Sequence, residues 1–66
     1  MDAIQKELES RKGEIKLGMK LLFDANFRIT EWDVPEANER EVARLLLDQM
    51  QEALDDLKKE ILSKNL

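Results

Sequence analysis

Residues 21–32, LLFDANFRITEW, decide the fold, because this stretch can continue a helix or turn back as a β-hairpin. The triplet DAN, residues 24–26, stands between Phe23 and Phe27. Asp favours the first position of a type I turn, and Asn tolerates the left-handed conformation that closes a three-residue hairpin loop. The segment FRIT then supplies aromatic and β-branched residues, which are typical of a strand. The stretch therefore favours a hairpin that turns at Asp24–Asn26.

The residues before the turn support the first strand. Every odd position from 15 to 23 is apolar, which is the period of a half-buried strand. These residues are Ile15, Leu17, Met19, Leu21 and Phe23. We therefore expect strands at about 14–23 and 27–33, with Trp32 lying across the hairpin from Gly18. The register near Thr30 stays open, because a bulge there would move Trp32 to the other face.

A helical pattern can also be drawn through this region, and it is the alternative. Its seam consists of Ile4, Leu8, Ile15, Leu22 and Ile29. That seam would have to include Arg11 and Gly18, and it leaves several apolar residues outside. Residues 26–30 are also mediocre helix formers. The strand pattern explains more residues, and the alternative is an all-α helical hairpin that forms a dimeric four-helix bundle.

A short helix is expected before the hairpin. Residues 2–12 are rich in good helix formers, and Asp2 can cap the first turn. Gly13 would end this helix as a C-terminal glycine.

A long helix is expected after the hairpin. Pro35 ends the second strand, and Asn38 with Glu41 has the spacing of a capping box. The helix then runs to about Ser63 along an apolar heptad seam of Ala43, Leu47, Met50, Leu54, Leu57 and Ile61. The predicted fold class is α+β: a short N-terminal helix, a two-stranded antiparallel hairpin and a long C-terminal helix.

The size of the chain predicts a single domain, residues 1–66, that associates with itself. Sixty-six residues bury too little apolar surface to offset the entropy of ordering, and the chain has no Cys or His for a disulfide or a common metal site. The long helix also extends past its own hairpin, so part of its seam needs other cover. We expect a homodimer whose interface is formed by Leu47, Met50, Leu54, Leu57 and Ile61.

Charge suggests one further surface. The net charge of −4 argues against non-specific binding to nucleic acid. Basic residues nevertheless gather around the single Trp on one face of the predicted hairpin, where they could contact an acidic protein partner. The residues of this predicted partner site are Lys16, Lys20, Arg28 and Trp32.

No catalytic arrangement can be named, so the chain is not expected to be an enzyme. We expect no cofactor and no bound metal, and no apolar run is long enough to cross a membrane. The expected compartment is the cytoplasm. The predicted function is that of a small, non-enzymatic protein-interaction or regulatory protein that acts as a homodimer. The alternative is a nucleic-acid-associated accessory protein that uses the basic hairpin face.

Overall fold

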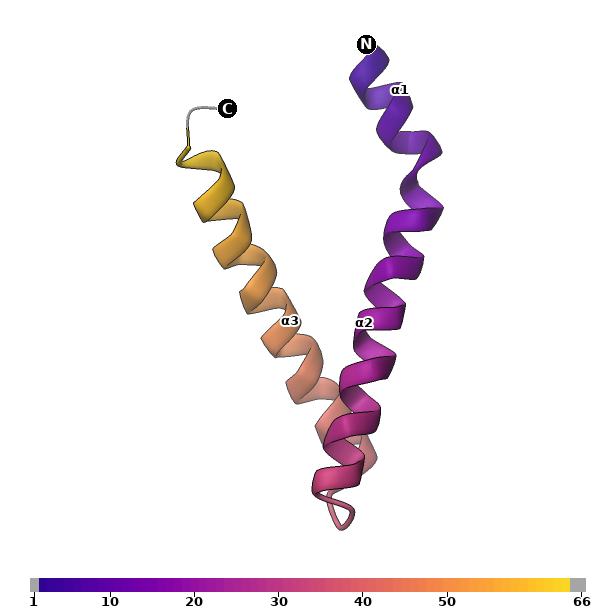
Figure 1. The fold of residues 1–66 in the computed structure, drawn as a ribbon, viewed down its shortest axis with the longest axis vertical. Coiled ribbons are helices and arrows are strands. Elements are labelled where there is room, and N and C mark those ends of the chain that lie inside the picture. The colour runs from indigo at the N-terminus through magenta and orange to yellow at the C-terminus, as the bar shows by residue number, and fades with distance from the viewer. Residues whose placement is uncertain (1, 65–66) are drawn as a thin grey trace.

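Three helices and no strand make up residues 2–64, which are the residues that the computed structural model describes. Helix α1 spans Ala3–Ser10, α2 spans Lys12–Asp33 and α3 spans Glu39–Leu62. Helix α1 continues the direction of α2, and α3 returns beside α2, so the chain forms a V that is closed at the loop (Figure 1). The predicted α+β class is therefore wrong, and the alternative, an all-α helical hairpin, describes the chain.

The predicted turn is helical because its polar side chains find partners within the helix. The side-chain amide of Asn26 donates to the carbonyl of Leu22 at 2.9 Å, and the hydroxyl of Thr30 donates to the carbonyl of Asn26 at 2.9 Å. Lys20 pairs with Asp24 one turn away, at 3.4 Å. A three-residue hairpin loop needs a left-handed residue. No residue of the described part has a positive φ, and the hairpin turn is absent there.

The alternation of apolar residues at odd positions misled the strand prediction. Ile15, Met19, Phe23 and Phe27 are all odd, but they are also four residues apart, which is the spacing of neighbours on a helix. In the structure the rings of Phe23 and Phe27 stack with their centroids 5.4 Å apart and their planes 16° apart. A run of this kind satisfies both periods, so the period could not separate strand from helix.

The junction between α1 and α2 lies at Arg11. The N–H of Arg11 donates to the carbonyls of Glu7 and Leu8, both at 3.2 Å, and the backbone leaves helical geometry there with φ −97° and ψ 2°. The prediction that Gly13 ends the first helix is wrong, because Gly13 lies inside α2. The cap at Asp2 is confirmed, since its carboxylate accepts the N–H of Gln5 at 3.0 Å.

Two local features explain the conformation of the loop between α2 and α3: the proline that follows Val34 and the cap at Asn38. Val34 lies outside the helical region, with φ −131° and ψ 72°, because the residue before a proline avoids that region. Asn38 accepts the N–H of Glu41 at 3.1 Å, which confirms the predicted cap. The long C-terminal helix is also confirmed, from Glu39 to Leu62.

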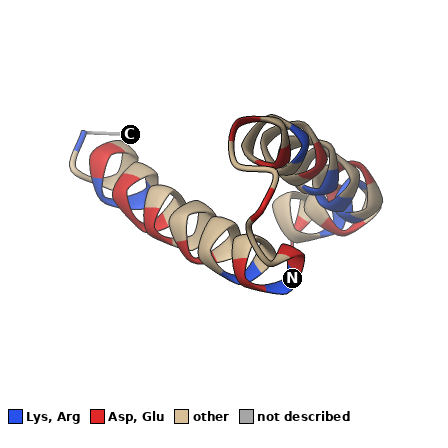
Figure 2. Ribbon diagram, turned by 90° about the horizontal axis from the view of Figure 1, so that it is seen from below, with Lys and Arg blue, Asp and Glu red and all other residues tan. Residues whose placement is uncertain are grey.

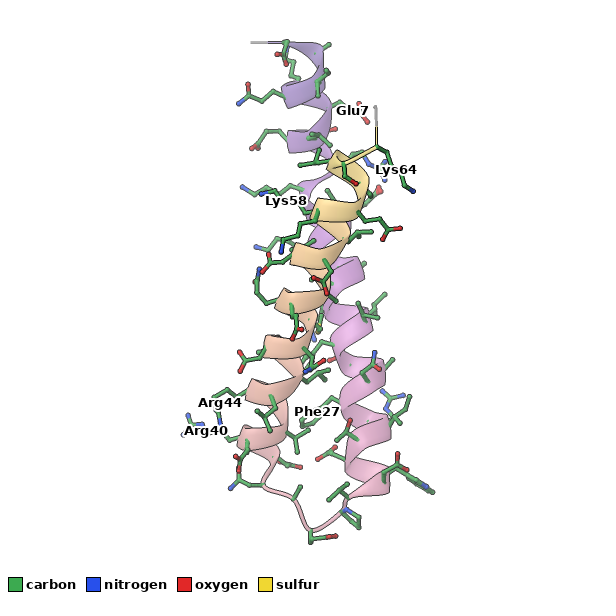
Figure 3. The ribbon with its side chains drawn as sticks, turned by 90° about the vertical axis from the view of Figure 1, so that its left-hand side faces the viewer. Glu7, Phe27, Arg40, Arg44, Lys58 and Lys64 are labelled. Carbon is green, nitrogen blue, oxygen red and sulfur yellow. The ribbon has the colours of Figure 1, made fainter. Side chains whose placement is uncertain are left out.

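The contact between α2 and α3 is confined to the half of the V that is near the loop. Val42 is the one buried apolar residue of the described chain, with 9% of its surface exposed. The half-buried apolar residues of α2 and α3 include Phe23, Phe27, Leu46 and Met50. Figure 3 shows Phe27 between the two helices.

The two helices diverge beyond this contact, where the facing side of α2 carries lysines beside the apolar residues Met19 and Leu22. Moving from Phe23 towards the N-terminus, the next residues at steps of three and four are Lys20, Lys16 and Lys12. An unpaired charge is costly to bury, so these lysines favour an open arrangement in which they stay in water.

Replacing Asp24 by Pro tests the helix through residues 21–32. The change removes a backbone hydrogen bond inside α2 and should lower the free energy of unfolding by about 3 kcal/mol, with a loss of helical circular dichroism. The control Asp24→Ala removes only the exposed pair with Lys20 and should cost no more than about 0.5 kcal/mol. Equal stabilities of the two variants would contradict the helix, because proline is tolerated at the corner of a hairpin turn.

Candidate interaction surfaces

The chain exposes far more surface than a compact protein of its mass. A folded monomer of 7.7 kDa is expected to expose about 4,300 Å², whereas this chain exposes 6153 Å². The radius of gyration is 15.6 Å, and a compact chain of this length would have about 11 Å. The open arms of the V account for both differences.

One row of apolar residues runs along α1 and α2 at intervals of seven residues. We call it the heptad row: Leu8, Ile15, Leu22 and Ile29. Their exposed fractions are 54%, 52%, 51% and 59%. Half-exposed leucine and isoleucine at a constant interval of seven is the pattern of a helix that packs along another helix. Helix α3 leaves this row largely open to water.

The dimer interface predicted from the sequence lies on α3, and the structure divides it. Met50 is half-buried against α2, whereas the other four residues are exposed. The exposed fractions of Leu47, Leu54, Leu57 and Ile61 are 53%, 47%, 49% and 40%. Nothing in a single chain tests whether these residues meet a second copy, so the interface on α3 stays a prediction.

The arms of the V border an open apolar hollow where they separate. It is lined from α2 by Met19 and Leu22, and from α3 by Met50, Ala53, Leu54 and Leu57. A second shallow hollow lies beside it and brings Leu47 of α3 next to Lys20 and Asp24 of α2. The exposed residues of α3 therefore partly face the chain's own α2.

The predicted partner site is not the face of a hairpin, and its four residues do not form one patch. Lys16 and Lys20 lie one turn apart on α2, and the amino group of Lys20 is 3.4 Å from the carboxylate of Asp24. Arg28 lies eight residues further on, which is about 12 Å along the axis. Arg28 and Trp32 together line a separate shallow hollow with Ile29.

The predicted contact between Trp32 and Gly18 is also wrong. Trp32 is 85% exposed at the loop end of α2. No atom lies within 4 Å of the position that a Cβ on Gly18 would occupy. Both residues lie on one helix, fourteen positions apart in the numbering, so they cannot meet within the chain.

Charged residues of both signs alternate along the outside of α3 (Figure 2). Arg44 pairs with Glu41 at 3.6 Å and with Asp48 at 3.9 Å. Arg40 and Arg44 project from α3 away from α2 (Figure 3). Exposed pairs of this kind contribute little to stability, and they describe a solvated helix face.

Two carboxyl groups meet where the closed end of the V joins α2 to α3. Glu31, near the end of α2, shares a hydrogen bond with Glu39, the first residue of α3, and this contact raises the pKa of Glu31 above its ordinary value of 4.5. Partial desolvation and the charge of Glu39 act in the same direction. Two neighbouring carboxyls resist ionising together, so the loop end holds a proton more tightly than either group alone.

The described chain offers no group of three or more His, Cys, Asp or Glu residues arranged to hold a metal ion. None of its helices is long and apolar enough to cross a membrane. Comparison of the sequence and the structure with protein-family models, curated proteins and solved structures found no match.

Replacing Glu31 by Gln tests the carboxyl pair. Because the pKa of Glu31 is higher in the folded chain, the contact favours folding at acidic pH, and that contribution is lost as the pH rises above 4.5 through the raised pKa. Glu31→Gln should therefore stabilise the protein at pH 7 and flatten the dependence of the melting temperature on pH. The control Glu36→Gln should leave that dependence unchanged, and identical pH profiles for Glu31→Gln and the native chain would contradict the contact.

Proposed function

We propose that this chain is a non-enzymatic protein-interaction or regulatory protein that acts as a homodimer. The observation that supports the proposal is the exposed surface, which exceeds that of a compact monomer by about 1,800 Å². Apolar surface left in water costs roughly 25 cal/mol for each Å², so the open V is poorly stable alone. A chain with no disulfide gains most from covering this surface with a partner.

The amount of surface fits a second copy of the chain. Two chains that each covered this excess would bury about 3,600 Å² in total, which falls within the range of obligate homodimers, about 2,000–5,000 Å². Weak, transient contacts bury much less. The proposed dimer would act in the cytoplasm, whose reducing conditions a chain without cysteine tolerates.

Analytical ultracentrifugation tests the dimer directly. We expect a species of twice the chain mass at about 100 µM, together with a melting temperature that rises with protein concentration, because association stabilises the folded state by mass action. A monomer at this concentration, with a melting temperature independent of concentration, would refute the proposal.

The surface proposed to contact another partner is the basic stripe, Lys12, Lys16 and Lys20, with one helical turn between successive residues. It includes two of the four residues of the predicted partner site. The overall charge of −4 weakens long-range attraction to nucleic acid, so an acidic protein surface is the proposed partner. The same stripe favours a nucleic-acid accessory protein as the second candidate, since phosphates are also bound by lysines in a line.

Charge reversal separates the two candidates. The double variant Lys12→Glu, Lys16→Glu should weaken binding of a labelled poly-glutamate peptide by about tenfold or more, because it replaces attraction with repulsion. The matched control Lys58→Glu, Lys59→Glu changes the net charge equally on α3 and should have little effect. Tight binding of a single-stranded oligonucleotide that falls steeply with salt would support the second candidate instead.

A further inference from the structure

The side of α2 that carries the heptad row alternates large and small residues. The heptad row supplies the large ones. A second set of residues lies three positions after each member of the heptad row, on the same side of the helix, and it also repeats every seven residues. Its members are Arg11, Gly18, Ala25 and Trp32. Gly18 and Ala25 stand in the middle of this side, and the space around Gly18 is open. The surface thus has knobs and holes in the positions that helix pairing requires.

Helix α2 carries more apolar surface than its own hairpin can cover. Phe23 and Phe27 pack towards α3 and are half-buried. Leu22 and Ile29 are more than half exposed, and Leu17 and Leu21 add exposed apolar surface on other sides. A helix that is apolar around much of its circumference is normally buried by several neighbours. Helix α3 packs against one side of α2, and no second helix of the described chain packs along the side that carries the heptad row.

The homodimer supplies a helix that can cover this side of α2. Resting on the proposed homodimer, we propose that this side of α2 packs antiparallel against the same side of α2 in a second copy, about a two-fold axis level with residue 20. A two-fold dimer uses the same patch on both chains, and the heptad row can therefore be covered by itself. The occupant is a second copy of this chain.

This register places large residues against small ones. Leu22 lies opposite the partner's Gly18, and Ile15 lies opposite the partner's Ala25. Each of these layers occurs twice by symmetry. The small residues admit the large ones, so the two helices can approach closely. At the ends of the contact, Leu8 meets the partner's Trp32, which covers the most exposed large apolar residue of the described chain.

The charges beside the contact are complementary in the same register. Glu14 lies next to the heptad residue Ile15, and Arg28 lies next to Ile29. The antiparallel arrangement brings Glu14 within two residues of the partner's Arg28, about 3 Å along the axis and twice by symmetry, where opposite charges favour the register. Ile29 falls opposite the partner's Arg11, whose aliphatic stem can cover it. Lys12 and Lys16 of the basic stripe border the same hollow as Leu8 and Ile15, so they lie at the edge of the contact.

The competing interface is the one on α3. Its central residues Leu54 and Leu57 border the hollow between the arms and partly face the chain's own α2. Leu22 of the heptad row borders the same hollow. Ile15 and Ile29 do not, because their hollows are lined only by residues of α1 and α2. The contact through α2 also accounts for Arg28 and Trp32, which the sequence had assigned to an outside partner.

A pair of glycine variants tests the contact. Gly18→Leu fills the hole that receives the partner's Leu22, and should raise the dissociation constant of the dimer by about tenfold or more. Gly13→Leu is the matched control. It makes the same change in the same helix, also in open space, but lies two residues from Ile15 and so on another side of α2. It should leave the dissociation constant within about threefold.

Cysteine pairing provides a measurement that does not depend on the stability of the variants. An equimolar mixture of Gly18→Cys and Leu22→Cys chains should form a disulfide-linked dimer on mild oxidation, because the two positions face each other across the interface. Either variant alone should link poorly, and so should Leu54→Cys.

The outcomes separate this inference from the proposed function. A dimer that Gly18→Leu leaves intact, or one that is linked through Leu54→Cys and not through the mixture, would overturn the α2 contact while the homodimer stands. A native chain that sediments as a monomer would overturn both. Weakening by Gly18→Leu but not by Gly13→Leu, together with linkage in the mixture alone, supports the α2 contact.

Discussion

The short apolar contact between α2 and α3 sets the limits of the whole structure. Phe23 and Phe27 are half-buried in this contact, and beyond them α2 carries lysines beside Met19 and Leu22. The helices therefore hold together near the loop and separate towards the termini (Figure 1). A chain that can close only half of its hairpin leaves the rest of its leucines and isoleucines in water, and that surface is costly unless something covers it.

The proposals about function follow from the apolar surface that the half-closed hairpin leaves in water. Among the described residues, the apolar rows and the lysines are the features that the fold itself does not use. Apolar surface of this size favours association, and the interval of seven in the heptad row favours association with another helix. The basic stripe lies where α2 and α3 diverge, and we propose it as the surface that contacts an acidic partner.

The candidate surfaces could be predicted from the sequence in part. The seam of the long helix was recognised, and its residues lie on α3 as expected, although Met50 is partly covered by α2. The partner site was assembled on a hairpin that does not exist. Lys16 and Lys20 stay together because they are one turn apart, whereas Arg28 and Trp32 lie further along the helix. The heptad row belongs to the helical alternative, whose seam also includes Arg11 and Gly18. We propose instead that Gly18 is a hole for a large residue of a second copy.

The sequence by itself determined the caps and the long C-terminal helix. Asp2 and Asn38 act through their own side chains on N–H groups three residues ahead, so their effect is local and can be predicted from residue type. It could not determine the state of residues 15–30, where spacings of two and of four coincide and Asn26 and Thr30 suit a turn as well as a helix. That choice was settled by helical neighbours, through the stacked rings of Phe23 and Phe27 and the bonds of Asn26 and Thr30 to carbonyls one turn back. Only the tertiary structure decided which apolar residues α3 covers, because the angle between two helices depends on how the ridges of side chains on one helix fit the grooves of the other.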